Sequence, residues 1–256
     1  MKKQTIFLLL TVFLLSLSCQ FLFPAQTGMV TSNCAEIVSS VAQLQSGEIP
    51  DHLLETSTKR GDEFDANRYF EVLTHISMRE GYVLDYVYQS DDLGGYPLLY
   101  ARPVDQAPYA SPGDIPNGTE LPGFQDHLAV DDTEQGYFEY VVLDMMANQF
   151  YLYWHAYYND YEIVCNRAEV NEIVAQVSSG DFGYAMDAGQ QARARALQNI
   201  EPTVSLSEDA ATVRVVTFTK WGGFYRETYT ISREFPHAII DIQHDNVVPY
   251  DCGIAF

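Results

Sequence analysis

Apolar residues recur at two different periods along the chain, first that of a helix and then that of a strand. Behind the polar residue Asn33, residues 34–44 carry apolar side chains three and four positions apart, which predicts a helix with Asn33 as its N-cap. The same spacing runs from Asp65 to Gly81 and predicts a second helix. Both helices therefore lie in the first third of the chain.

After Gly81 the pattern changes to the alternation of a β-strand. Segments 82–88 and 96–100 flank an Asp- and Gly-rich turn and predict a hairpin, whose second strand contains Pro97 and therefore lies at a sheet edge. The elements predicted next are strands 137–143 and 149–157, a strand-like segment 161–165, a helix opened by Asn166 with Glu169 as its capping partner, and a helix near 190–197.

The last third of the chain predicts a three-stranded meander. Segments 212–221 and 224–232 are joined by Gly222-Gly223, which suits a two-residue turn, and a third strand follows at 237–244. Alternating polar and apolar residues are typical of antiparallel strands. We therefore predict an α+β fold: an antiparallel sheet of hairpins with a C-terminal three-stranded meander, on which two to four helices pack.

The first 18 residues have the three parts of a secretory signal peptide. Lys2 and Lys3 precede an apolar run, residues 6–17, and the small residue Ser18 stands before Cys19. The apolar run is too short to cross about 30 Å of hydrocarbon, which takes roughly 20 residues. An uncleaved anchor extending to residue 23 is the weaker alternative, because serine and glutamine interrupt it.

The residues before Cys19 resemble a bacterial lipobox, in which small residues precede a cysteine that receives a lipid. The match is imperfect because Ser16 stands where leucine is usual, and Ser16 and Ser18 also suit ordinary signal peptidase. We favour lipidation of Cys19, which would hold the protein on a membrane. The predicted organisation is a signal peptide (1–18), a tether (19–32) and a single globular domain (33–256).

Charge narrows the possible partners. The chain has 14 Lys and Arg against 35 Asp and Glu, a net charge of −21 that becomes −23 when Lys2 and Lys3 leave with the signal peptide. Nucleic acids and anionic lipid surfaces are bound by clustered cations, so this balance argues against both. Aromatic residues make up 13% of the chain, which is enough for a folded core rather than a disordered acidic segment.

Export predicts an oxidising environment, in which cysteines pair. If Cys19 is lipidated, Cys34, Cys165 and Cys252 remain, and one of them is left free. Cys165 and Cys252 both flank strand-like segments, which favours a Cys165–Cys252 disulfide. The other pairings stay open.

The sequence carries no recognisable catalytic, metal or nucleotide motif, so we assign no catalytic residue, metal or cofactor. One candidate binding surface is a strand face with three tyrosines and a histidine, and a second is the tip of the last hairpin. Packing under other elements or cross-strand stabilisation is the simpler interpretation of each. The candidate ligand-binding residues are Tyr151, Tyr153, His155, Tyr157, Trp221, Phe224 and Arg226.

Two further segments have structural as well as functional interpretations. Residues 103–125 contain five prolines and three glycines and predict a long ordered loop or a lid. The acidic stretch 126–134 does not have the spacing of a calcium-binding loop, so we interpret it as a solvated run of charges.

These observations favour an exported, lipid-anchored envelope protein, not an enzyme, that binds an unidentified ligand or protein. The expected location is the cell envelope, with a soluble secreted protein as the alternative. The competing hypothesis is an exported hydrolase with two acidic residues in a cleft under the 103–125 loop. A purely structural or assembly role is the third possibility.

Overall fold

The computed structural model describes residues 27–29, 33–92, 94–153, 161–181 and 183–254. Its largest sheet is antiparallel and has six strands in the order β1-β7-β8-β9-β10, with β6 also paired to β8. These strands are β1 (Thr27–Met29), β6 (Glu162–Val164), β7 (Thr203–Leu206), β8 (Ala210–Thr219), β9 (Gly223–Ser232) and β10 (Ile239–Pro249). Residues 27–29, placed in the tether by the sequence pattern, thus form an edge strand of this sheet.

Two small antiparallel sheets complete the β structure. Strand β2 (Ile76–Met78) pairs with β5 (Leu128–Val130), and β3 (Tyr82–Asp91) pairs with β4 (Gly94–Pro103). Pro97 lies on β4, which pairs with β3 along one side only, as predicted for an edge strand. The predicted first hairpin is therefore confirmed.

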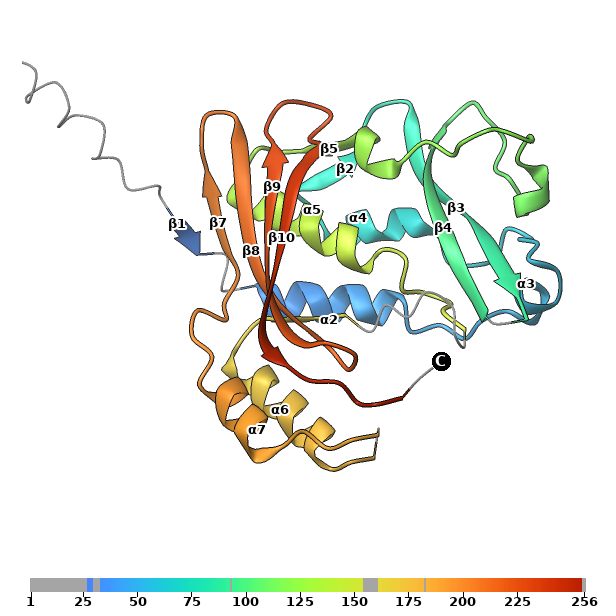
Figure 1. The fold of residues 1–256 in the computed structure, drawn as a ribbon. Coiled ribbons are helices and arrows are strands. Elements are labelled where there is room, and N and C mark those ends of the chain that lie inside the picture. The colour runs from blue at the N-terminus through green and yellow to red at the C-terminus, as the bar shows by residue number, and fades with distance from the viewer. Residues whose placement is uncertain (1–26, 30–32, 93, 154–160, 182, 255–256) are drawn as a thin grey trace, which may run out of the picture.

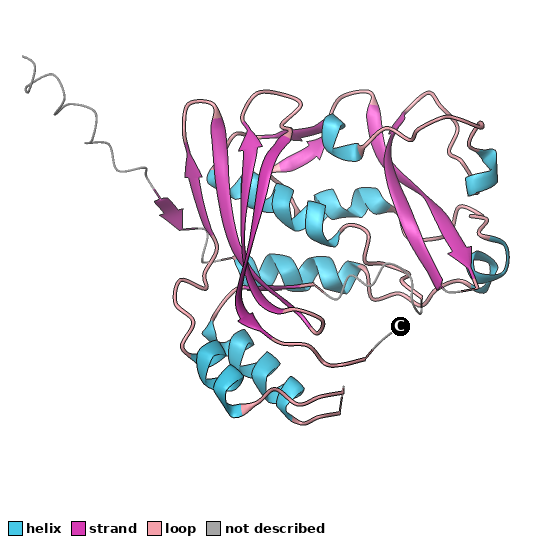
Figure 2. Ribbon diagram, viewed as in Figure 1, coloured by secondary structure: helices cyan, strands magenta, loops and turns pink. Residues whose placement is uncertain are grey.

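Helices lie between the six-stranded sheet and the β3–β4 hairpin, as Figure 2 shows. They are α2 (Cys34–Leu44), α4 (Tyr69–Val72) and α5 (Glu134–Met146), while α3 (Asp51–Thr56) lies beside β3. Helices α6 (Arg167–Ser178) and α7 (Ala188–Arg195) pack together at one end of the sheet (Figure 1). The short 3-10 helices are η1 (Ala66–Arg68), η2 (Pro112–Asp114) and η3 (Phe124–His127). The predicted α+β fold, with antiparallel sheets and a C-terminal meander, is confirmed.

Both faces of the β8–β9 hairpin are buried near its loop. Val215 and Tyr229 face the larger core, formed with α2 and α5, while Phe218 and Phe224 face a second core formed with α6 and α7. Successive strand residues point to opposite faces, so a hairpin buried on both sides carries apolar residues at consecutive positions.

The strand predicted at 137–143 is wrong, because these residues lie within helix α5. Nearly every residue of α5 is buried, from Gly136 to Met146, so its apolar residues lie all round the helix and leave no helical period in the sequence. Thr133 caps the helix by accepting a hydrogen bond from the N–H of Gly136 at 3.0 Å. The predicted helix 65–81 is also too long. The helical segment consists of η1 followed directly by α4, which ends at Val72, and strand β2 begins at Ile76.

The predicted turn of the last hairpin is off by one residue. Phe218 pairs with Phe224 and Thr219 with Gly223, so three residues, 220–222, form the loop. Gly223 has φ +91°, and a side chain there would collide with the carbonyl of Val248, so the glycine is required at this position. Consequently Trp221 and Phe224 do not form the predicted cross-strand pair.

One disulfide is present, as expected, but the predicted Cys165–Cys252 pairing is wrong. Cys34 is bonded to Cys165, and Cys252 is a buried free thiol. Strand β6 alternates between the two cores, which places Ile163 and Cys165 with Cys34 in the larger core and Val164 in the second core. Cys252 also packs in the second core, on the other side of the sheet from Cys165.

Asp144 on α5 gives a pH-dependent prediction. Burial raises the pKa of its carboxyl, although the amide of Gln125 donates a hydrogen bond to it at 3.0 Å. The ordinary pKa is about 3.9 in an unfolded chain. The folded chain therefore holds this proton to a higher pH, and the carboxyl destabilises the fold increasingly as the pH rises towards the folded pKa.

We therefore expect Asp144→Asn to stabilise the protein by about 1 kcal/mol at pH 7 and by nothing measurable at pH 3. Thermal unfolding at both pH values measures the difference. Asp126→Asn, at an exposed position on η3, is the matched control. A destabilised Asp144→Asn variant at pH 7 would contradict this interpretation.

Candidate functional site

The predicted tyrosine face is not a strand face in the part of it that the structure describes. Tyr151 has φ +56°, which breaks the alternation, and its hydroxyl accepts a hydrogen bond from the N–H of Phe64 at 3.0 Å. Tyr153 is 47% exposed and forms an isolated bridge with Gly95. His155 and Tyr157 lie outside the described residues. Tyr151 thus supports the loop that contains Phe64.

The residues predicted to form a site at the tip of the last hairpin do not come together either. Phe224 is fully buried, with its ring 4.8 Å from that of Phe218, so it presents no exposed surface. The indole N–H of Trp221 donates to the carbonyl of Ile254 at 2.8 Å. Arg226 donates to the carbonyl of Gln198 at 2.9 Å and lines a groove on the outer face of the sheet. These three residues do not form one site.

We take a cleft beside the first hairpin as the candidate site, because charged side chains and aromatic rings line it together. It has a volume of about 510 Å³, within the usual 300–1,000 Å³ of small-molecule sites. The 103–125 loop contributes residues 108–110 to its lining. We call it the β3–β4 cleft; its lining residues are 59–61, 63–67, 84–86, 102 and 108–110.

A carboxylate between two cations lies in the cleft. The Asp85 carboxylate is 2.6 Å from the ammonium of Lys59 through Oδ1 and 2.6 Å from Nε of Arg102 through Oδ2. These side chains are largely buried, with 11% of Lys59 and of Asp85 and 17% of Arg102 exposed. The three charges sum to +1 in a chain whose net charge is −21.

The hairpin register and the loops place these groups. Asp85 pairs with Tyr100, so Arg102 is its diagonal neighbour on the same face of the hairpin. Lys59 lies in the loop after α3. The backbone N–H of Lys59 donates a hydrogen bond to the carbonyl of Ala110 at 2.8 Å, which fixes this loop. The cleft therefore depends on a contact between two distant loops as well as on the hairpin.

Tyr86 contributes an aromatic surface and an unsatisfied polar atom. The Lys59 ammonium lies 4.5 Å from the centroid of its ring, within the range of a cation–π interaction. Tyr86 is 3% exposed, and its hydroxyl has no hydrogen-bond partner among the described residues. Burial raises the pKa of this hydroxyl, so it is a neutral O–H group at physiological pH.

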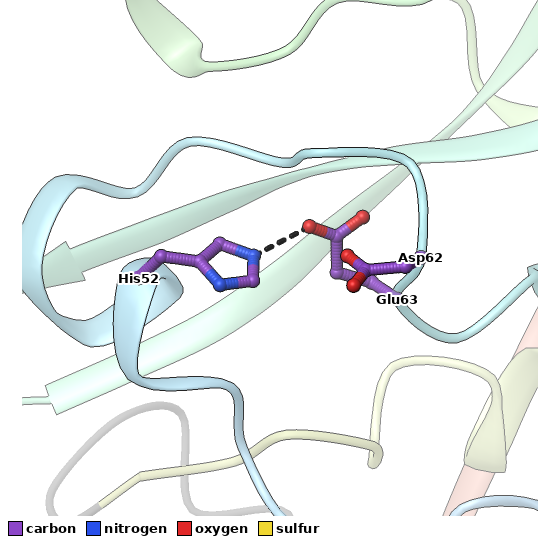
Figure 3. Close-up of side chains that lie close together, drawn as sticks. All are labelled: His52, Asp62 and Glu63. Carbon is purple, nitrogen blue, oxygen red and sulfur yellow. Dashed lines mark hydrogen bonds and ion pairs between the residues drawn. The ribbon is translucent and has the colours of Figure 1, made fainter.

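Next to the cleft, three side chains come close enough to hold a metal ion. One ligand atom from each of His52, Asp62 and Glu63 lies within 4.8 Å of the others (Figure 3). Nε2 of His52 is 2.6 Å from Oε1 of Glu63, and the carboxylate of Glu63 also accepts the N–H groups of Arg60 and Gly61. Most of the carboxylate's hydrogen-bonding capacity is thus already used within the protein.

The Glu63 carboxylate therefore fixes the 60–63 loop. Burial alone would raise its pKa, but the hydrogen bonds from Arg60, His52 and Gly61 outweigh burial and hold the pKa below its usual value. A lowered pKa keeps the group ionised, as an acceptor of several N–H bonds should be. We interpret the His52–Glu63 pair as a structural contact that holds the 60–63 loop at the wall of the cleft.

The hydrolase hypothesis requires two carboxyl groups, one of them with a raised pKa. Glu63, Asp65 and Asp85 all line the cleft. The Glu63 pKa is lowered, Asp85 is paired with two cations, and Asp65 accepts two hydrogen bonds from Asn67. The hypothesis stays untested, and these three carboxylates have structural partners.

The acidic stretch 126–134 has structural contacts as well. Asp131 accepts hydrogen bonds from the Thr133 hydroxyl and from His75, at 2.5 and 2.6 Å. Asp132 is 2.6 Å from the guanidinium of Arg233, and this bond lowers its pKa. The stretch thus joins the start of α5 to the end of β9.

Sequence reasoning missed the cleft residues Lys59, Asp85, Tyr86 and Arg102. A usable signal was present only for Asp85 and Arg102, because the predicted hairpin brings them near each other. The contact of Lys59 with Asp85 spans 26 positions and follows from tertiary packing.

No helix in the described part of the chain has the length and apolar character needed to cross a bilayer. Comparison of the chain with models of protein families, with curated proteins and with solved structures finds no match in any of the three.

Proposed function

We propose that this chain is an exported, lipid-anchored protein of the cell envelope that binds a small polar molecule in the β3–β4 cleft. The observation that carries the binding function is the cleft itself: about 510 Å³ lined by largely buried charged groups and aromatic rings. Converging polar groups in a concave site are typical of small-molecule recognition.

The cysteines support the anchor. Cys34 and Cys165 are bonded to each other, so neither is free to pair with Cys19. Cys252 is buried in the second core and is therefore not accessible to Cys19. An exported protein keeps few unpaired thiols unless they have another use. Lipidation gives Cys19 such a use.

The geometry suits a cleft that opens away from the membrane. Thr27 at the start of β1 is eight positions after Cys19, a span of at most roughly 28 Å. Figure 1 shows β1 at one end of the fold and the β3–β4 hairpin at the other. A protein anchored at Cys19 would therefore hold the cleft at the distal end.

Two-dimensional NMR of the isotope-labelled protein tests the binding function. Hexoses, hexuronates, hexose phosphates and amino acids are added separately at millimolar concentration. We expect at least one probe to shift amide signals of the cleft residues, and Tyr109→Ala to abolish the shift. Tyr184→Ala, at a position 74% exposed outside the cleft, is the control. Shifts of amide signals only at residues outside the cleft would contradict the proposal.

A further inference from the structure

Resting on the proposed function, we infer that the β3–β4 cleft selects a small anionic ligand, one that carries a carboxylate or a phosphate group. The anionic group would contact Lys59 and Arg102, and Arg60 would lie at the rim. The inference depends on which hydrogen-bonding groups of the cleft are already used.

Several hydrogen-bond donors of the cleft have no partner among the described residues. The ammonium of Lys59 has three N–H groups and makes one hydrogen bond to a carboxylate, that of Asp85. Arg102 uses Nε for Asp85 and Nη1 for the carbonyls of Pro103 and Gln106, while its Nη2 makes no hydrogen bond to any described residue. Arg60 is exposed, and its guanidinium makes no ion pair with a described residue.

Most hydrogen-bond acceptors of the cleft already have donors within the protein. The Asp85 carboxylate accepts hydrogen bonds from Lys59, from Arg102 and from the N–H of Tyr86. Glu63 accepts from His52 and two backbone N–H groups. The Tyr86 hydroxyl also has no partner among the described residues, but it is buried and is not exposed to the open cleft. A ligand that satisfies the cleft must therefore supply acceptor atoms.

The cations of the cleft favour the same chemistry, and the charge of the whole chain limits the size of the ligand. Lys59, Arg60 and Arg102 line the cleft together with Glu63, Asp65 and Asp85, so the charges balance, but the three carboxylates already accept hydrogen bonds within the protein. A carboxylate or phosphate gains charge-assisted hydrogen bonds from Arg and Lys. The acidic remainder of the surface repels a long polyanion, so the favoured ligand is a small molecule rather than a nucleic acid.

Isothermal titration calorimetry with glucose, glucuronate and glucose 6-phosphate tests the inference. The protein is obtained by expressing the full chain, so that it is processed as it normally is. We expect glucuronate or glucose 6-phosphate to bind at least about tenfold more tightly than glucose, a difference of about 1.4 kcal/mol. The tighter of the two identifies the carboxylate or the phosphate as the preferred group, and added salt should weaken its binding.

Two variants remove donors while the Asp85 carboxylate keeps its cationic neighbours. Arg60→Gln and Arg102→Lys should each weaken binding of the anionic probe by several-fold, with circular dichroism unchanged. Arg68→Gln, which loses an exposed cation outside the cleft, should bind as the parent does.

Three results overturn the inference. Glucose binding as tightly as either anion would show a cleft that does not select charge, and the proposed binding function would survive. Anionic binding that resists both added salt and Arg102→Lys would place the anion elsewhere. Absence of binding by both anions, in a protein whose cleft signals shift with a neutral probe, would also overturn it and leave the proposed function intact.

Discussion

Replacing both Cys34 and Cys165 with alanine is expected to lower the free energy of unfolding by about 4 kcal/mol. The disulfide closes a loop of 131 residues, more than half of the chain. In the chain-entropy model, opening so long a loop returns a large amount of conformational freedom to the unfolded state. The bond also joins the first residue of α2 to the residue that follows β6.

Urea unfolding of the oxidised protein and of the double variant measures this difference. Cys252→Ala is the matched control, because it removes a buried cysteine of the second core and leaves the disulfide intact. We expect the control to lose about 1 kcal/mol, as for a small buried side chain. A double variant as stable as the parent would show that Cys34 and Cys165 are not bonded in the native protein.

Asp85→Ala is expected to lower the free energy of unfolding by about 3 kcal/mol, because it leaves two buried cations without their carboxylate. Lys59 and Arg102 are only 11% and 17% exposed, so water compensates poorly for the lost partner. Chemical denaturation at neutral pH gives the value.

The exposed pair of Arg68 and Glu71 provides the control for Asp85→Ala. Both side chains are at least half exposed, and their atoms are 3.8 Å apart, so Glu71→Ala should change stability by less than about 0.5 kcal/mol. Equal losses in the two variants would mean that the Lys59–Asp85–Arg102 group is solvated like an ordinary surface pair.

Local signals in the sequence predicted the elements whose stability is decided locally. Helix α6 begins where expected: the Asn166 side chain accepts the N–H groups of Ala168 and Glu169, and Glu169 reaches back to the N–H of Cys165. Helix α2 and the C-terminal meander were also predicted, because their apolar residues recur at the period of a helix and of a strand.

Elements buried on all sides were the ones missed. Helix α5 is enclosed by the sheet and by other helices, so its apolar residues have no helical period, and the aromatic and β-branched run 137–143 resembles a strand. The one-residue error at Gly222-Gly223 has a different cause. Two adjacent glycines permit positive φ at either position, and the packing of Gly223 against Val248 decides between them.

The candidate site depends on contacts that no local pattern records. Asp85 is within 2.6 Å of residues 26 positions before it and 17 positions after it. Strand alternation on β6 determines which core receives Cys165, but only the folded sheet shows that Cys34 lies in that core and Cys252 in the other. A chain with 35 acidic residues offers too many carboxylates for sequence to identify the paired one.

The proposed export, the proposed lipid anchor and the disulfide all depend on the state of the four cysteines. Mass spectrometry of the unreduced protein after bacterial expression of the full chain reads that state directly. We predict an N-terminal peptide that begins at a diacylglyceryl-modified Cys19, a linked peptide pair containing Cys34 and Cys165, and a free thiol at Cys252. An unmodified Cys19 in the isolated protein, or Cys165 bonded to Cys252, would contradict the account.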